Sequence, residues 1–365
     1  NDLNRVFSLV QNIGEKKTSM PILLNVLLIA ERNLLKIFAT DLTLSAMVEV
    51  PANVSKEGKT TVNTRIFSDI LRELPEGEIE LKLTEGERLE IKTKQSVLRI
   101  IGQSSDEFPG LPGIGVETKG KIPAAQLSEM IQKTIYSVST DETRYNLTGV
   151  CFESITEKKG QTFLRAVSTD GHRLASMIKP SQGLKISDRA VVPRKGLQEI
   201  KKLLDIDVQA EIGVDVKDGF FVVETKSAKV ASRLIDGEYP EYEQVIPKTE
   251  GELAKIRASE FAQALRRVLL LVTDKNKGIK LDFSKDKLRI TSSSPELGDA
   301  KEEIAIEYKG EQFSVGFNAK YLLDIAELNG EGAILNLDLH GDVGPCKISS
   351  ENDDSSIAIV MPMRL

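Results

Sequence analysis

Apolar residues follow a helical period in two kinds of segment, and each kind occurs three times along the chain. The first kind has its apolar face at these positions: Leu3, Val6, Phe7, Val10 and Ile13; Leu127, Met130, Ile131, Ile135 and Val138; and Phe261, Leu265, Val268, Leu269 and Val272. The second kind follows the tripeptides Asn63-Thr64-Arg65, Pro193-Arg194-Lys195 and Asn318-Ala319-Lys320. Each third of the chain is therefore predicted to contain two amphipathic helices.

Between the helical segments, polar and apolar residues alternate with a period of two. Residues 78–83 (Glu-Ile-Glu-Leu-Lys-Leu) and 303–306 (Glu-Ile-Ala-Ile) are examples. Such alternation is typical of antiparallel strands with one exposed face. Lys217-Asp218-Gly219 predicts a hairpin turn. The fold class expected is α+β, with two helices packed on antiparallel sheets in each repeat.

The segments recur at a fixed interval. Residues 34–42, 163–170 and 287–294 resemble one another, and Leu35, Leu164 and Leu288 lie 129 and 124 residues apart. The interval is too long for a solenoid, so each copy is expected to be a domain. Pro and Gly gather at 108–113 and 239–247, which places the domains at 1–116, 117–248 and 249–365. Copies two and three have a short strand before their first helix (120–123 and 254–257). Copy one has none, so an N-terminal strand is expected to be missing.

Composition and charge narrow the class of protein. No apolar run of about 18 residues predicts a membrane span, and the start of the chain lacks a signal-peptide pattern. The two cysteines, Cys151 and Cys346, are far apart, which favours a reducing, cytoplasmic location. The net charge of −6 argues mildly against ordinary nucleic-acid binding unless the positive charge is confined to one surface.

Basic residues do gather on the helices, opposite their apolar faces. The helical segments and their ends supply Arg65, Arg72, Arg194, Lys195, Lys201, Arg266, Lys275 and Lys277. A solvated helix face explains any one of these helices, but a bias shared by three repeats favours contact with DNA phosphates. No Trp is present and no aromatic series accompanies the charge, so sequence-blind contact with a duplex is expected. An acidic exterior with basic helices indicates a lined concavity.

Three functions remain open on the residues alone: a protein that contacts duplex DNA, an enzyme that uses His172, and a peptide-binding scaffold that does not bind DNA. His172 has Asp170 nearby, but no nucleophile elbow or oxyanion hole accompanies it. His340 is the only other histidine, which argues against a metal site. Residues 115–121 match most of a phosphate-binding loop, yet Ile122 replaces the required Ser or Thr. No catalytic residue, metal or cofactor is expected.

Several motifs resemble the β subunit of bacterial DNA polymerase III, the sliding-clamp family, over the whole chain. They are 20–23 (Met-Pro-Ile-Leu), 144–149 (Arg-Tyr-Asn-Leu-Thr-Gly), 168–175 (Ser-Thr-Asp-Gly-His-Arg-Leu-Ala), 192–196 (Val-Pro-Arg-Lys-Gly), 236–242 (Asp-Gly-Glu-Tyr-Pro-Glu-Tyr) and 360–365 (Val-Met-Pro-Met-Arg-Leu). The resemblance implies three clamp-type domains and a head-to-tail dimeric ring around duplex DNA. It also implies that polymerases, the clamp loader and other proteins with a clamp-binding motif are partners.

The resemblance further implies a pocket that receives short peptides from these partners. Its residues would be Leu147, Thr169, Gly171, His172, Arg173, Leu174, Pro240, Val245, Pro345, Ile359, Val360, Met361, Pro362, Met363, Arg364 and Leu365. Leu, Val, Pro and Met suit an adaptable apolar groove, and Arg173 and Arg364 would hold polar groups at its rim. Gln244 and Pro345 depart from the family pattern, where arginine and serine are found.

For DNA, the resemblance points to Lys17, Tyr145, Lys195 and Lys277, with Asn146 where some relatives have a second tyrosine. For the dimer, Leu270 points away from the apolar face of its helix. A leucine in this position is exposed, lies on a frayed helix end, or is buried by a partner. The resemblance supports the last, with Leu271 beside it and Phe108 and Leu111 of a second copy opposite.

Overall fold

The computed structural model describes residues 2–14, 18–156, 160–186, 188–273 and 277–364. The chain divides into two compact units. The first comprises Asn1–Ser128, Thr156–Thr162 and Pro180–Ile235, and the second comprises Glu129–Ile155, Phe163–Lys179 and Asp236–Leu365. The helices are α1 (Asp2–Phe7), α2 (Thr64–Glu73), α3 (Ala124–Thr134), α4 (Arg194–Leu204), α5 (Ala258–Leu269) and α6 (Ala319–Leu328). No described helix is long and apolar enough to cross a membrane.

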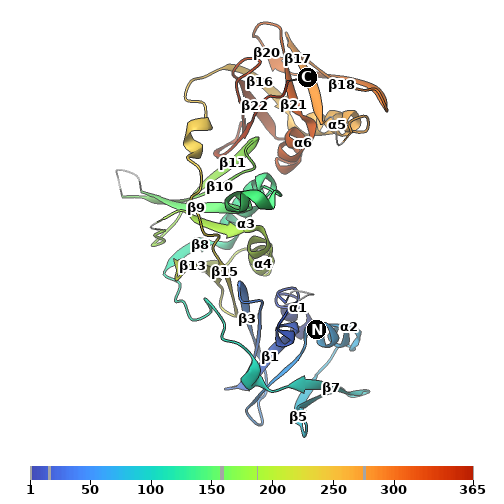
Figure 1. The fold of residues 1–365 in the computed structure, drawn as a ribbon, viewed down its shortest axis with the longest axis vertical. Coiled ribbons are helices and arrows are strands. Elements are labelled where there is room, and N and C mark those ends of the chain that lie inside the picture. The colour runs from blue at the N-terminus through green and yellow to red at the C-terminus, as the bar shows by residue number, and fades with distance from the viewer. Residues whose placement is uncertain (1, 15–17, 157–159, 187, 274–276, 365) are drawn as a thin grey trace. The chain divides into compact units, whose positions relative to one another are not determined.

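The first unit is built on one sheet with the strand order β5-β6-β7-β4-β1-β2-β3-β15-β14-β13-β8. The strands are β1 (Asn25–Glu31), β2 (Leu34–Thr40), β3 (Leu44–Pro51), β4 (Gly58–Asn63), β5 (Glu80–Thr84), β6 (Arg88–Lys92), β7 (Val97–Gln103), β8 (Gly120–Pro123), β13 (Glu211–Lys217), β14 (Phe220–Glu224) and β15 (Ala228–Arg233); β12 (Ala190–Pro193) precedes α4. β3 of the first repeat pairs antiparallel with β15 of the second, from Val48↔Ala228 to Leu44↔Ser232 (Figure 1). The sheet therefore continues from one repeat into the next.

The second unit repeats this joint. The strands of one sheet that lie within this unit have the order β9-β10-β11-β24-β23-β22-β16-β20, and a second sheet has the order β19-β18-β17-β21. The strands are β9 (Gly149–Thr156), β10 (Thr162–Thr169), β11 (Arg173–Pro180), β16 (Glu252–Arg257), β17 (Gly278–Ser284), β18 (Lys287–Ser294), β19 (Gly298–Ala305), β20 (Glu307–Tyr308), β21 (Phe313–Asn318), β22 (Ile334–Leu339), β23 (Cys346–Ser350) and β24 (Asp353–Val360). β11 of the second repeat pairs with β24 of the third, from Arg173↔Val360 to Met177↔Ser356. Both joints therefore pair equivalent strands, because β3 of the first repeat corresponds to β11 of the second, and β15 of the second corresponds to β24 of the third.

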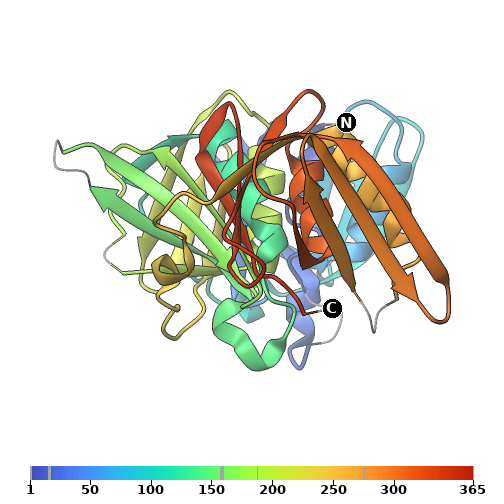
Figure 2. The same ribbon diagram turned by 90° about the horizontal axis from the view of Figure 1, so that it is seen from above.

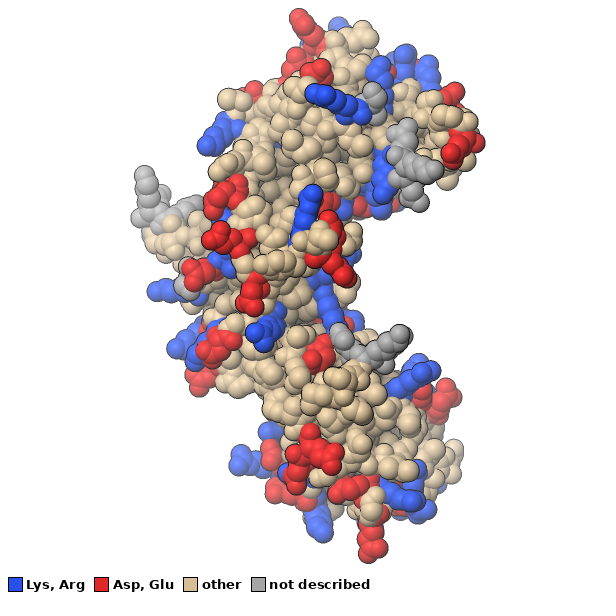
Figure 3. Space-filling view, in the orientation of Figure 1, with Lys and Arg blue, Asp and Glu red and all other residues tan. Residues whose placement is uncertain are grey.

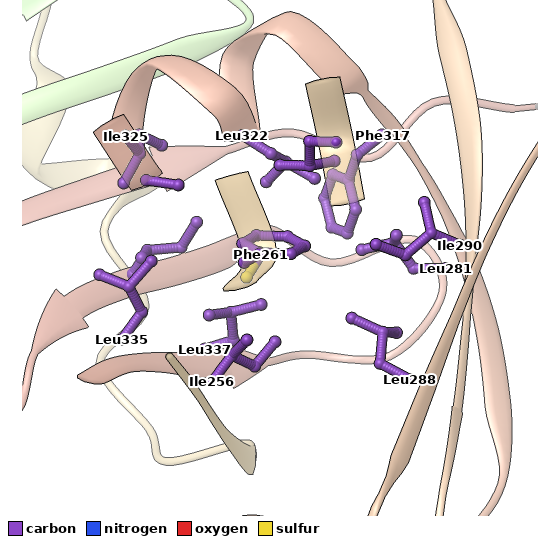
Figure 4. Close-up of a cluster of buried hydrophobic side chains, with 14 of the residues drawn as sticks. Ile256, Phe261, Leu281, Leu288, Ile290, Phe317, Leu322, Ile325, Leu335 and Leu337 are labelled. Atoms are coloured by element: carbon purple, nitrogen blue, oxygen red, sulfur yellow. The ribbon is translucent and has the colours of Figure 1, made fainter. Parts of the chain in front are cut away.

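The core of the third repeat shows why the apolar faces of its helices are needed. α5 packs against α6 and against β18 and β19 (Figure 2). Phe261 on α5 lies at the centre of the cluster, with Leu322 of α6 and Leu337 of β22 among its neighbours (Figure 4). All three side chains are at most 1% exposed. Burying each of them contributes about 1.5–3 kcal/mol of hydrophobic free energy.

The predicted hairpin at 217–219 is confirmed. Lys217 pairs with Phe220, so Asp218 and Gly219 form a two-residue turn between β13 and β14. Both turn residues have positive φ, 53° and 77°. This backbone is the one that a tight hairpin requires, and Asp-Gly adopts it at low cost. The short strands expected before the first helices of copies two and three are also present as β8 and β16.

The first helix of the chain is shorter than its apolar pattern predicts, because α1 ends at Phe7. The hydroxyl of Ser8 donates to the carbonyl of Arg5 at 2.6 Å. The next amides bond three residues back, as Val10 does to Phe7 at 3.0 Å, which tightens the backbone into turns. The apolar positions still serve the core, since Val10 and Ile13 are fully buried. The periodicity therefore identified the buried face and not the helix end.

Candidate functional site

The pairing of β11 with β24 brings the segment 169–174 beside the C-terminal strand. Leu174 lies opposite Ile359, and both side chains are buried. A turn precedes β11, and its shape is set by Asp170, whose Oδ1 accepts the backbone N–H groups of His172 (2.9 Å) and Arg173 (3.0 Å). Leu174 and Ile359, more than 180 residues apart in sequence, therefore belong to one layer of apolar side chains. His172 is exposed at the edge of this layer.

The chain after β24 leaves the sheet but stays attached to the surface. β24 ends at Val360, and Pro362 cannot donate to a ladder. The amide of Met361 donates to the carbonyl of His172 (2.9 Å), and that of Met363 donates to Gly316 (2.8 Å). The side chains of the two methionines are 37% and 39% exposed. The backbone of the tail is thus fixed, while two flexible apolar side chains face solvent.

Two short 3-10 helices supply further residues of the predicted pocket: η4 (Glu142–Leu147) and η5 (Tyr242–Val245). Leu147 is buried, whereas Pro240 and Val245 are exposed. Asn146 Nδ2 donates to the carbonyl of Glu238 at 2.9 Å and so links η4 to the segment before η5. Pro345 adjoins Cys346, which pairs with Val360. These residues of the predicted pocket therefore all belong to the second unit, and Pro240 and Val245 are exposed while Leu147 is not.

Gly171 is required by the close approach of η4. Its φ is +88°, and a Cβ on this residue would lie 2.8 Å from Nη1 of Arg144. The same nitrogen donates to the carbonyl of Asp170 at 3.2 Å. A side chain at position 171 would both strain the backbone and displace this arginine.

Arg173 is the most constrained charged residue of the site. Its guanidinium donates from Nε to Asp170 (2.9 Å), from Nη1 to Asp324 (2.7 Å) and from Nη2 to the carbonyl of Tyr136 (2.6 Å). It also lies 4.3 Å from the ring centroid of Tyr321. The side chain is only 11% exposed. These contacts join residues of the second and third repeats, whereas Arg364, the other cation expected at the rim, is exposed.

Two side chains near the tail bear on whether the site could be catalytic. His172 is exposed. Burial raises the pKa of the Cys346 thiol, which is 1% exposed, so this thiol is protonated and a poor nucleophile. Within the described ranges, no group of three or more His, Cys, Asp or Glu residues is arranged to hold a metal ion. Leu365, which was expected in the pocket, lies outside the described residues.

The basic residues predicted to contact DNA lie on helices or at their ends, and several are paired with carboxylates. Arg72 pairs with Asp69, Lys201 with Asp205 (3.0 Å) and Arg266 with Glu327 (2.8 Å). Arg65, Arg194 and Lys277 are exposed, as is the ring of Tyr145. Lys17 and Lys275 lie outside the described residues. In the view of Figure 3, Lys and Arg are interspersed with Asp and Glu, so no unmixed basic face is visible on that side.

A polar depression lies on the first unit beside these helices. Its volume is about 580 Å³, and it is lined by Asn4, Arg5, Ser8, Gln11, Asn12 and Arg72. Amides, hydroxyls and guanidinium groups of this kind suit contact with phosphate oxygens. Sequence patterns did not indicate it, because residues 4–12 and Arg72 of α2 contribute to it from positions at least 60 residues apart in the chain.

Lys195 has a structural contact that the sequence did not predict. Its Nζ lies 2.5 Å from Oδ2 of Asp41 and 3.3 Å from the carbonyl of Ile13. Burial would raise the pKa of Asp41, but hydrogen bonds from Lys195, Thr43 and Leu44 outweigh it and lower the pKa below its ordinary value. Asp41 belongs to the first repeat and Lys195 to the second. The signal that could have identified this pair is Asp41 itself, which occupies the same repeat position as Asp170.

The residues predicted at a dimer interface are exposed or half-buried. Leu270 caps α5 and is 76% exposed, and Leu271, Phe108 and Leu111 are half-buried. On β7 and α2 the structure adds apolar residues that the sequence analysis missed. These are Val97 (52% exposed), Ile101 (76%) and Ile66 (51%). Exposed apolar side chains mark a surface that binds another protein where they form a contiguous patch.

Comparison with known proteins identifies the family. Residues 1–112, 121–241 and 243–364 match the N-terminal, central and C-terminal domains of the DNA polymerase III beta subunit. The beta sliding clamp of Caulobacter vibrioides is 33% identical over 87% of this chain and 85% of its own length, and that of Proteus mirabilis is 33% identical over 96% and 94%.

Solved structures agree with this family. The crystal structure of the Caulobacter crescentus beta sliding clamp has a TM-score of 0.93 at 30% identity, covering 100% of this chain and 96% of that one. The sliding clamp of Bartonella birtlesii, bound to griselimycin, has a TM-score of 0.93 at 29% identity, covering 100% and 98%. The predicted three-domain α+β fold is confirmed by these matches. The chain therefore belongs to the family of DNA polymerase III beta subunits, the bacterial beta sliding clamps.

Proposed function

We propose that two copies of this chain close head to tail into a ring that encircles duplex DNA and tethers polymerases and the clamp loader. Sliding clamps are non-catalytic processivity factors, and this chain, as a family member, is not an enzyme. The observation that carries the proposal is the repetition of one sheet joint, β3 with β15 and β11 with β24, and the third joint that it implies.

The third joint would use β19 and β7. β19 follows β18 in the third repeat as β3 follows β2 in the first, and it ends its sheet. β7 is the strand of the first repeat that corresponds to β15 and β24. On one side, its residues 97–101 pair with β6. On the other side, β4 pairs only with Gly102 and Gln103. Edges of this kind are templates for a further strand. β19 of one copy would pair with β7 of another, which is a heterologous contact, and two such contacts close a ring.

Apolar residues beside these edges support the same joint. Leu270 lies at the end of α5, and this helix packs against β19. Ile101 lies on β7. Both are 76% exposed in the single chain. Leu271 would lie on the first side, and Phe108 and Leu111 on the other. Their burial between two copies would stabilise the joint by about 25 cal/mol per Å² of apolar surface.

The DNA contact we propose is sequence-blind. Lys17, Arg65, Arg72, Tyr145, Arg194, Lys195, Lys201, Arg266, Lys275 and Lys277 would face phosphates from helices and helix ends. Pairing of several of these cations with nearby carboxylates keeps each contact weak. A duplex held in this way can slide, because no base edge is read. The three repeats, 1–116, 117–248 and 249–365, would each contribute two helices to the DNA-facing side.

The partner site we propose is the apolar surface around the tail. Leu147, Leu174, Val245, Pro345, Ile359 and Val360, with Thr169, Gly171, His172, Pro240 and residues 361–365, would hold a short peptide. The fixed backbone and free side chains of Met361 and Met363 favour adaptable binding. Arg173 would shape this surface from beneath through its contacts with Asp170 and Asp324, and Arg364 would meet polar groups of the peptide. The two cysteines are both buried and far apart in sequence, which fits a reducing cytoplasm.

Loading on circular DNA tests the function directly. Purified chain, an ATP-driven bacterial clamp loader and nicked circular DNA would be mixed, and bound protein separated by gel filtration. We expect retention on the circle that requires ATP and is lost when the circle is cut once. Equal retention on linear and circular DNA would contradict encirclement. Absence of any loader-dependent retention, with a loader that loads its own clamp, would contradict the proposed function.

A further inference from the structure

The two joints within the chain share a turn that carries a carboxylate at the same place. Asp41 follows β2 in the first repeat, and Oδ1 accepts the amides of Thr43 (2.9 Å) and Leu44 (2.7 Å). Asp170 follows β10 in the second repeat and holds its turn with the same two bonds, to His172 and Arg173. In both turns one carboxylate oxygen is used by the backbone and the second is available for a cation.

At each joint that second oxygen is bound by a cation at the boundary with the next repeat. Asp41 Oδ2 meets Lys195, the second residue of α4, at 2.5 Å. Asp170 Oδ2 meets Arg173 at 2.9 Å, and Arg173 in turn meets Asp324 at 2.7 Å. Asp324 also pairs at 2.7 Å with Lys320, the second residue of α6. Each internal joint is therefore closed by a half-buried ionic link that ends at the second residue of the next helix.

The third repeat has a related turn, one residue longer than the turn after β2, in which a serine takes the place of the aspartate: Ser294 pairs with Gly298, whereas Asp41 bonds to Leu44. Ser294, the last residue of β18, is 6% exposed and accepts the amides of Glu296 and Leu297, both at 3.3 Å. A hydroxyl can cap the turn, but it has no second oxygen and no charge. The second residue of the helix that would follow it is Arg65 on α2 of another copy. The side chain of Arg65 is 90% exposed, and its ion pair with Asp69 is long, at 3.9 Å.

We propose that Ser294 weakens the joint between copies, because a serine cannot form the ionic link that closes both joints within the chain. The inference rests on the proposed ring. In that ring, the joint made by Ser294 and Arg65 of two copies is held by strand pairing and apolar contact, without this link. It is therefore the joint that separates when the ring opens.

Restoring the carboxylate tests the assignment. Ser294→Asp gives the turn the residue that Asp41 and Asp170 have at the corresponding position, and one carboxylate oxygen can accept the amides of Glu296 and Leu297 in place of the hydroxyl. Subunit exchange would be followed by fluorescence transfer between two labelled populations of the full chain. An exposed ion pair contributes about 0.2–1 kcal/mol, which corresponds to about a 1.5- to 5-fold slower opening of one joint. Because a ring has two such joints, the dimer dissociation constant should fall by the square of that factor.

Two variants separate the charge from the capping. Ser294→Asn caps the turn with an uncharged oxygen, and it should exchange as fast as the unaltered chain. Arg65→Gln combined with Ser294→Asp should lose the gain, because the cation is gone. The gain should also disappear in about 1 M salt, where surface charges are screened. Equal slowing by Ser294→Asn, or a dimeric Ser294→Asp that exchanges at the unaltered rate, would overturn the proposal.

The outcome distinguishes this inference from the ring itself. Sedimentation of the unaltered chain as a monomer at micromolar concentration would overturn both. A dimeric unaltered chain with no effect of Ser294→Asp would overturn this inference alone. If Ser294→Asp folds poorly, Asp41→Ser is the converse experiment. It should speed hydrogen exchange of the β3 and β15 amides in the first joint, and unchanged exchange there would count equally against the role of the carboxylate.

Discussion

The amide of Met361 donates to the carbonyl of His172 over 2.9 Å, one residue after β24 has ended. The bond ties the tail to the turn between β10 and β11, although the side chain of Met361 remains 37% exposed. The position of the tail is thus set by its backbone. What the tail offers a partner is set separately, by its side chains.

Truncating those side chains should therefore reduce partner binding without loosening the tail. For Met361→Ala with Met363→Ala we expect at least about a tenfold loss of affinity for a clamp-binding peptide, since about 1–3 kcal/mol is lost with each buried apolar side chain. Calorimetry would measure it. Leu253→Ala, which removes a leucine that is 47% exposed elsewhere in the third repeat, is the control. Unchanged affinity in the double variant would remove the methionines from the site.

Charging the end of α5 should separate the copies. Leu270→Asp with Leu271→Asp places two carboxylates in an apolar joint, where they would be desolvated without partners. We expect folded monomers by sedimentation at low micromolar concentration. Val343→Asp is a matched control, because Val343 is also 76% exposed and lies outside the proposed joint. A charged double variant that remains fully dimeric would exclude Leu270 from the interface.

Removing helix cations should weaken DNA binding equally for every sequence. With Arg72→Ala, Arg194→Ala and Lys277→Ala combined, the slope of log affinity against log salt should decrease by about 0.9 for each DNA phosphate that the protein no longer neutralises. Fluorescence anisotropy with two unrelated duplexes at several salt concentrations would measure this. Lys82→Ala, Lys92→Ala and Lys217→Ala combined, on strands β5, β6 and β13, control for net charge. Weakening that is confined to one duplex would contradict sequence-blind binding.

Asp41 should make folding stability depend on pH. Its pKa in the folded chain lies below the ordinary 3.8, so the carboxylate stabilises the fold above that value and loses its effect as the pH falls through the lowered pKa. Asp41→Asn keeps the turn but removes the charge. We expect Asp41→Asn to lower the free energy of unfolding by about 1–2 kcal/mol at pH 7 and by less near pH 3. The loss at pH 7 is limited because the side chain of Lys195 is 41% exposed, so solvent screens the ion pair. Denaturation of both proteins at the two pH values would test it, with the exposed Asp69→Asn as control. A loss that is the same at both pH values would contradict an ionic role.

Replacing Arg173 should be among the most destabilising changes in the second unit. Arg173→Met leaves Asp170 and Asp324 without their shared cation in a site where all three are at most 15% exposed. Removing one partner of a buried ionic network costs about 3–5 kcal/mol. Arg173→Lys should recover part of this loss, because it restores one charge but not the planar fork. Calorimetric melting would rank the three proteins, and an unaltered melting temperature for Arg173→Met would contradict the role described.

Much of the fold followed from side-chain periodicity, and its failures have physical causes. The buried faces of all three first helices were predicted, because Phe7, Leu127 and Phe261 recur with their neighbours at helical spacing. The end of α1 was not predicted, since it depends on a hydroxyl of Ser8 that competes for a carbonyl. The pairing of β3 with β15 could not be predicted from alternation, which reports the faces of a strand and not its edges.

The candidate site divides in the same way. The apolar character of Leu174, Ile359 and Met361 was visible in the sequence, and the family resemblance indicated that they belong together. The engagement of Arg173 was not visible, because Asp324 and Tyr136 reach it from distant parts of the chain. The link between Lys195 and Asp41 was hidden for the same reason. An arginine or lysine in a motif does not reveal whether its charge is directed outward or is already neutralised.

The first two repeats are held together by strand pairing as well as by the chain that connects them. Five residue pairs join β3 to β15, while the connecting segment passes through the exposed Gly110. Beyond it, Ile114 and Val116 accept hydrogen bonds from Lys229 and stay with the second repeat. We expect a protease that cuts at Gly110 to leave a nicked protein with its parts in place. We also expect two fragments that are produced separately to reassemble by completing the sheet between β3 and β15.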